Sequence, residues 1–120
     1  MSGPVDLDAL AAHVRERGPA AYLVSVGEDQ APHVVSVEAT FEDGTLRATV
    51  GRTTAGNLAR RPRATFLWPP AGSDHSLIVD GTAEVDGAEG AVAVRPTRAV
   101  LHRVAGAPAD VPSCIALERA

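Results

Sequence analysis

The chain contains no lysine, and all of its 11 basic residues are arginine. A protein without lysine cannot form a Schiff base with a carbonyl substrate. It also cannot complete the P-loop motif, in which a lysine reaches the phosphates of a nucleotide. Imine-forming catalysis and P-loop nucleotide hydrolysis are therefore excluded.

Cysteine is almost absent. Cys114 is the single cysteine, so the chain forms no internal disulfide and no multi-cysteine metal site. It has no activating neighbour in the sequence, and we expect it to be a small buried residue. This cysteine usage favours a cytoplasmic location. Charged residues interrupt segment 1–18, which argues against a signal peptide. No run approaches the roughly 20 apolar residues of a membrane span.

Aromatic residues make up only 3% of the 120 residues, whereas hydrophobic residues as a whole make up 45%. Valine and alanine therefore supply most of the apolar mass, and the length predicts one domain over residues 1–120. The formal net charge of −4 argues against a nucleic-acid-binding protein. The scarcity of aromatic side chains, on which bases would stack, argues the same way.

Two short helices are expected, over residues 7–17 and 54–61. The first has apolar residues at helical spacing. For the second, Thr53 or Thr54 can act as the N-cap and Pro62 ends the helix.

The rest of the chain is typical of short β-strands, in which apolar and polar residues alternate. Gly81 is expected to mark a bulge or bend in one strand, and Pro96 to break the last long one. The first three strands are expected to form an antiparallel meander. The expected strands are 21–26, 33–41, 45–50, 63–68, 76–85 and 91–104, with a further short strand within 113–117. About six short strands with two small helices favour a closed or partly closed antiparallel barrel.

The charges are unevenly distributed along the chain. Residues 44–73 contain no acidic residue but hold five arginines: Arg47, Arg52, Arg60, Arg61 and Arg63. The run Arg52-Thr53-Thr54 falls where a strand is expected to lead into a helix, which is a favourable place for a bound anion. For Arg60, Arg61 and Arg63, a solvated helix end is an equally good interpretation. A second acid-free stretch, 90–109, is interpreted as an ordinary outer face.

No group of residues in the sequence predicts protein-supplied catalysis. Asp74-His75-Ser76 has the residue types of a hydrolase triad, but sequence neighbours do not assemble that geometry. The four histidines are scattered, so no metal site is expected. The catalytic residues are unknown, and a cofactor is expected to carry any chemistry.

Segment 22–85 resembles the pyridoxamine-5'-phosphate-oxidase-like, FMN-binding split-barrel family. The similar stretches are GEDQAPHVVSV, EDGTL, GRTTAGNLARRPRAT and LIVDGTAEV, in this order. The most specific piece starts at Asn57 and is similar to the N-L-x-x-x-P run of the family.

The resemblance implies a mainly β fold, a six-stranded antiparallel split β-barrel with about two short helices. It also implies a homodimer with FMN, or the deazaflavin F420, bound in the clefts between the subunits. The side chains and main chain of one strand would line the flavin ring, and the loop and helix after it would hold ribityl and phosphate. The implied cofactor-binding residues are Val35, Ser36, Val37, Thr49, Arg52, Thr53, Thr54 and Asn57.

The chain departs from the family at two places. Many members have a phosphate-binding lysine near the position of Thr54, and this chain has none. It also ends in SCIALERA, whereas pyridoxamine-phosphate oxidases are longer and end in an arginine-containing substrate segment, which argues against vitamin B6 oxidation. A composition rich in alanine and arginine is typical of high-GC genomes, such as those of actinobacteria, in which F420 occurs.

The leading hypothesis is therefore an FMN- or F420-dependent oxidoreductase acting on an unknown small molecule. One alternative is a non-catalytic binding protein of the same fold, with or without a cofactor. Another is a haem-binding relative in which His33 or His102 ligates the iron.

Overall fold

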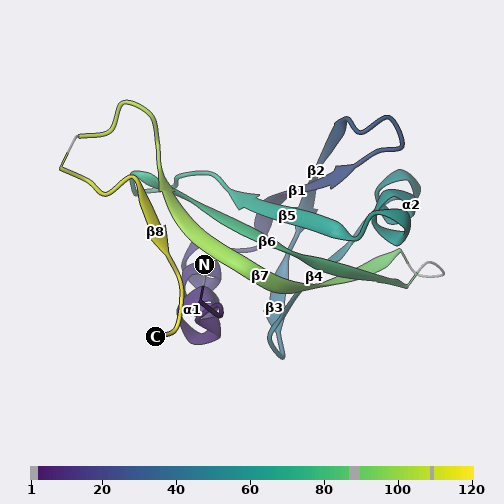
Figure 1. Cartoon of the computed structure of the whole chain (residues 1–120), viewed down its shortest axis with the longest axis horizontal. Coiled ribbons are helices and arrows are strands. Elements are labelled where there is room, and N and C mark those ends of the chain that lie inside the picture. The colour runs from purple at the N-terminus through teal and green to yellow at the C-terminus, as the bar shows by residue number, and fades with distance from the viewer. Residues whose placement is uncertain (1–2, 87–89, 109) are drawn as a thin grey trace.

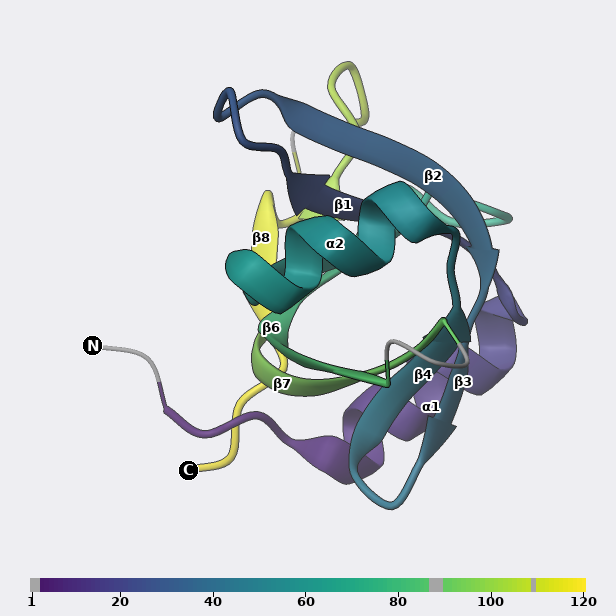
Figure 2. The ribbon, with the colours of Figure 1, turned by 90° about the vertical axis from the view of Figure 1, so that its right-hand side faces the viewer.

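The strands form a single antiparallel sheet that curls into a barrel (Figures 1 and 2). The computed structural model describes residues 3–86, 90–108 and 110–120. Eight strands and two helices occur among these residues. They are α1 (Leu7–Arg17), β1 (Ala20–Val26), β2 (Pro32–Glu38), β3 (Thr40–Glu42), β4 (Thr45–Thr49), α2 (Arg52–Arg60), β5 (Arg63–Trp68), β6 (His75–Asp86), β7 (Ala91–Arg103) and β8 (Cys114–Ala116).

The order of strands in the sheet explains how the barrel closes. Neighbouring strands follow the path β2-β1-β5-β6-β7-β4-β3. The short strand β8 lies off this path and pairs with the C-terminal part of β7. The two ends of this path, β2 and β3, are consecutive in the chain and are separated by Ala39 alone. The Ala39 N–H leaves the strand ladder and donates to the Pro19 carbonyl oxygen at 2.7 Å. The sheet is therefore closed through the covalent chain at this bend.

The same bend accounts for the difference in strand number. The strand predicted over residues 33–41 is two strands, β2 and β3, because the chain turns from pairing with β1 to pairing with β4. The predicted last strand is confirmed as β8. The barrel class is thus as expected, with eight strands in place of six.

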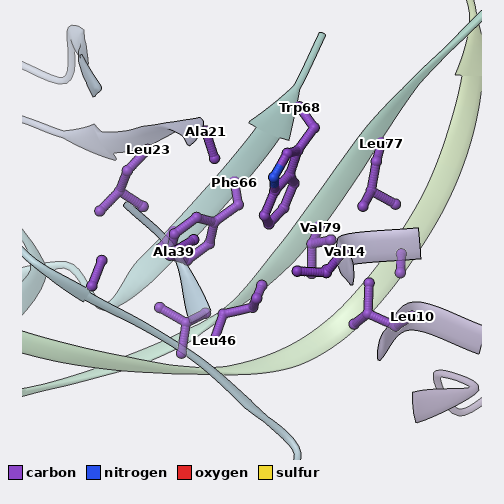
Figure 3. Close-up of a cluster of buried hydrophobic side chains, with 14 of the residues drawn as sticks. Leu10, Val14, Ala21, Leu23, Ala39, Leu46, Phe66, Trp68, Leu77 and Val79 are labelled. Carbon is purple, nitrogen blue, oxygen red and sulfur yellow. The ribbon is translucent and has the colours of Figure 1, made fainter. Parts of the chain in front are cut away.

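The core lies inside the curled sheet and is capped by α1, as Figure 3 shows. Leu23, Phe66 and Val79 are buried and lie in register on three neighbouring strands. Phe66 stacks on Trp68, with 5.9 Å between the ring centroids. The Trp68 indole Nε1–H donates to the Gly18 carbonyl oxygen at 2.9 Å, which satisfies the one polar atom of that ring.

Gly81 marks a bulge, as predicted. The register of β6 on β7 shifts between Asp80 and Gly81. A Cβ at Gly81 would lie 2.4 Å from the carbonyl oxygen of Arg95, so only glycine fits this close approach. Pro96 faces Gly81 across the bulge. Since the pairing resumes on both sides, β7 runs through Pro96 and is not broken there.

Both helices begin close to where they were expected, but the cap of α2 differs from the prediction. Thr53 and Thr54 lie inside the first turn of α2, and its N-cap is Gly51, which makes no side-chain hydrogen bond. The prediction that a threonine caps α2 is therefore wrong. In contrast, α1 has a side-chain cap, because Asp6 Oδ1 accepts from the Ala9 N–H at 3.1 Å.

Cys114 is exposed, so the prediction that it is buried is wrong. It lies on β8, which pairs with β7 and whose three residues are all exposed. Among the residues that the structure describes, no helix has the length and apolar character needed to cross a membrane.

Candidate functional site

The first turn of α2 has backbone N–H groups that no cap satisfies. The N-cap Gly51 has no side chain. In the first hydrogen bond of the helix, the Ala55 N–H donates to the Gly51 carbonyl oxygen at 3.0 Å. The N–H groups of the three residues before Ala55 precede this first helical bond. The first turn contains no acidic residue. The partial positive charge of the helix N-terminus is therefore available to an anion.

The helix α2 lies across one end of the barrel, as Figure 2 shows, and two polar contacts hold it there. The amide Nδ2–H of Asn57 donates to the Ser25 hydroxyl at 3.2 Å, and both side chains are buried. Arg61, just after the helix, donates from Nε to the Val26 carbonyl oxygen at 2.7 Å. Because both partners lie on β1 or directly at its end, the helix is fixed to the β1–β2 hairpin.

The predicted phosphate residues divide between the surface and the interior. Arg52 and Thr53 are exposed in the first turn of α2. Thr54, by contrast, is only 2% exposed, and Asn57 is used by its contact with Ser25. Of the predicted residues on this helix, Arg52 and Thr53 are therefore the most accessible to a ligand.

The three predicted flavin-lining residues on β2 also point in different directions. Val37 is buried and Val35 packs against the core, so both side chains face the inside of the barrel. The Ser36 side chain faces outward. Since β2 is the last strand on its side of the sheet, the main chain of these residues and the Ser36 side chain are what a ligand outside the barrel can reach.

Two cavities lie beside these residues. A cavity of about 750 Å³ lies between the tip of the β1–β2 hairpin and α2, and its lining includes His33, Thr53 and Asn57. A cavity of about 590 Å³ includes Thr49 in its lining, together with Arg47. The structure thus places Thr49 apart from Thr53 and Asn57, in a separate hollow.

Acidic residues that sequence reasoning did not include lie near both cavities. Glu28 and Asp29 line the first, and Glu38, Glu84 and Asp86 line the second. The alternation of β2 could have predicted one of them, because Glu38 lies two residues after Ser36 and therefore on the same outward face. The others come from distant segments that only the fold brings close.

The arginines of the acid-free segment do not form one surface. Arg52 begins α2, whereas Arg60 and Arg61 lie at its other end, and Arg61 is bound to β1. Arg47 lies on β4, where its Nε–H donates to the Thr45 hydroxyl at 3.1 Å. Arg52 is therefore the cation at the start of α2.

We expect Asn57→Ala to lower the free energy of unfolding by about 1–3 kcal/mol, because it leaves the buried Ser25 hydroxyl without its partner. Chemical denaturation of this variant, of Ser25→Ala and of the double variant forms a thermodynamic cycle. The double variant should lose less than the sum of the two single losses. Full additivity would contradict the contact.

No protein-family model and no curated protein matches the chain. Solved structures do match it. A Clostridium acetobutylicum protein, described as related to general stress protein 26 and of the pyridoxinephosphate oxidase family, superposes with a TM-score of 0.67 at 12% identity over 95% of this chain and 96% of the other. An F420 reductase superposes with a TM-score of 0.60 at 20% identity over 80% and 97% of the two chains.

The haem storage protein HutZ from Vibrio cholerae has the same architecture, with a TM-score of 0.55 at 12% identity over 76% of this chain and 89% of the other. These identities are low and establish the fold only. The chain has the pyridoxamine 5'-phosphate oxidase-like split-barrel fold.

Proposed function

We propose that the protein is an oxidoreductase that binds FMN or the deazaflavin F420 and acts on a small molecule. The observation that carries this proposal is the uncapped first turn of α2, where Arg52 and Thr53 are exposed and no acidic residue is present. Both cofactors carry a phosphate group, and this turn offers N–H donors, a hydroxyl and a guanidinium for it. The similarity to an F420 reductase supports the same interpretation.

The roles that we propose for the accessible residues are those that the family resemblance implies. Arg52 and Thr53 would bind the phosphate, and Thr49, at the end of β4, would bind the ribityl chain. Ser36 and the main chain of Val35 and Val37 would lie along the ring. Thr54 stands where many family members have lysine, and its side chain is buried. Arg52 therefore takes over the positive charge.

When bound, the cofactor would supply the hydride-transfer chemistry. The chain itself would bind and orient it, and would exclude water from its ring. The main chain of β2 is suited to orienting the cofactor, because strand geometry fixes its N–H and C=O groups before any ligand arrives. The fixed position of α2 on β1 is suited to binding the cofactor, because it sets the distance from the phosphate to β2.

We further propose that two copies associate through the outer face of the sheet. Tyr22 is 42% exposed and Val34 56% exposed on this face. One row across the sheet, which we call the outer row, is nearly all apolar. It consists of Ser36, Tyr22, Leu67, Ile78, Val100 and Ala116, paired in this order. Val100 is already buried within the chain, and a second copy would cover the rest of the row and complete a cofactor cleft beside β2.

Fluorescence titration of the purified protein with FMN and with F420 tests the proposal. Saturable binding is expected for one of them, and Arg52→Ala should weaken it about tenfold or more, as the loss of a charge-assisted hydrogen bond of about 1.5–3 kcal/mol implies. Arg60→Ala, at the other end of α2, is the matched control and should bind normally. The proposal fails if neither cofactor binds at high micromolar concentration.

Haem binding is the second candidate. His33 lines the cavity beside α2, and HutZ shows that this architecture occurs in a haem storage protein. Haem added to the purified protein should then produce a Soret band that His33→Ala weakens. Without such a band, this candidate is eliminated.

A further inference from the structure

A separate polar cavity lies at the bulge of the sheet, which we call the bulge pocket. It has a volume of about 560 Å³. The polar side chains of its lining come from three neighbouring strands. They are Arg63 and Thr65 on β5, Asp80 and Thr82 on β6, and Thr97 and Arg98 on β7. The pocket lies near the end of α2 that is opposite Arg52. Because the nine residues of the helix span about 13 Å, the pocket is separate from the phosphate site proposed at Arg52.

The register explains why these side chains converge. Thr65, Asp80 and Arg98 are paired across the three strands and share the outer face. Arg63 pairs with Thr82 two residues along, and strand alternation places that pair on the same face. The bulge adds Thr97 as an extra residue in β7, and its hydroxyl donates to the Asp80 carbonyl oxygen at 3.2 Å.

The single acid of the pocket is already engaged at both carboxylate oxygens. Asp80 Oδ1 accepts from the Thr65 hydroxyl at 2.6 Å, and Oδ2 accepts from Arg98 Nη1 at 3.3 Å. Among the described residues, Arg63 has no ion-pair partner and the Thr82 hydroxyl has no hydrogen bond. The pocket therefore has one positive charge in excess, on a chain whose formal net charge is −4.

We propose that the bulge pocket binds a small oxyanion, a phosphate or carboxylate group carried by a small organic molecule. The guanidinium of Arg63 and the hydroxyl of Thr82 bind the anion, and the free N–H groups of Arg98 complete the site. A planar guanidinium suits such anions because two of its N–H groups can donate in parallel. The volume lies within the roughly 300–1,000 Å³ of ligand sites and exceeds that of a bare anion, which leaves room for the organic part.

The test uses the full chain labelled with ¹⁵N and titrated with inorganic phosphate, and separately with acetate, at constant ionic strength. We expect saturable amide shifts at residues 63–65, 80–82 and 97–98 with at least one of the two, which also tells phosphate from carboxylate preference. Arg63→Gln should weaken this binding about tenfold or more, and Thr82→Val should weaken it less. Arg15→Gln, at an exposed arginine on α1 outside the pocket, should leave it unchanged.

Three results would overturn the proposal. They are shifts that grow linearly without saturation, shifts confined to the first turn of α2, and saturable shifts that Arg63→Gln does not weaken. Shifts confined to α2 would still agree with the proposed cofactor site. The two proposals therefore fail separately.

Discussion

Replacing Tyr22 by aspartate should separate the two copies of the proposed dimer and strongly weaken cofactor binding at concentrations that saturate the wild type. Tyr22 lies within the outer row, between Ser36 on β2 and Leu67 on β5. An aspartate there would bring an unpaired charge into the interface. Central tyrosines of interfaces often contribute 2 kcal/mol or more, which corresponds to roughly a 30-fold loss of association.

Analytical ultracentrifugation and a fluorescence titration with the preferred cofactor measure the two effects. Leu7→Asp is the control, since Leu7 is 40% exposed, against 42% for Tyr22, and lies on α1, away from the outer row. This control should remain dimeric and bind the cofactor. A wild-type protein that is monomeric and still binds cofactor would refute the interface, as would a Tyr22→Asp variant that remains dimeric.

Phe66→Ala is expected to be among the most destabilising single truncations in the core, with a loss of about 3–5 kcal/mol in the free energy of unfolding. The side chain is fully buried between Leu23 on β1 and Val79 on β6, and it stacks on Trp68. Small domains are stable by only about 5–15 kcal/mol. The variant should therefore lose a large part of its stability.

The composition is the reason for this large effect. The surrounding core consists mostly of valine, alanine and leucine, and these small side chains cannot expand to fill the space of a lost ring. Urea denaturation measures the loss, and Phe41→Ala, at a half-buried position, should lose clearly less. Equal losses for the two variants would contradict the central position of Phe66.

Much of the local structure was predictable from the sequence. The alternation in β2 correctly separated Val35 and Val37, which face inward, from Val34 and Ser36, which face outward. The expected strands 33–41 and 45–50 leave only residues 42–44 to connect them, and Asp43 and Gly44 both have the positive φ angles that a tight hairpin needs. These features depend on residues that are close together in the sequence, so they can be predicted without knowing the partners of a strand.

The candidate site was less predictable, for reasons that its residues make clear. Arg52 and Thr53 are accessible as expected, but Thr54 and Asn57 are turned toward the interior by the packing of α2 on β1 and β6. Periodicity over nine residues does not show which face of a short helix is covered. The bulge pocket was equally hidden, since Arg63 and Arg98 are 35 positions apart and meet only through the register of β5, β6 and β7.

By itself, the sequence determined which chemistries are excluded and where most strands and turns lie. The lack of lysine removes imine and P-loop chemistry whatever the fold. The tertiary structure alone decided that the sheet closes at Ala39, that the arginines of segment 44–73 separate, and that an outer apolar row exists. The physical reason is that alternation assigns each side chain to one of two faces, whereas the partner of a strand is chosen by contacts far away in the chain, as in the pairing of β4 with β7.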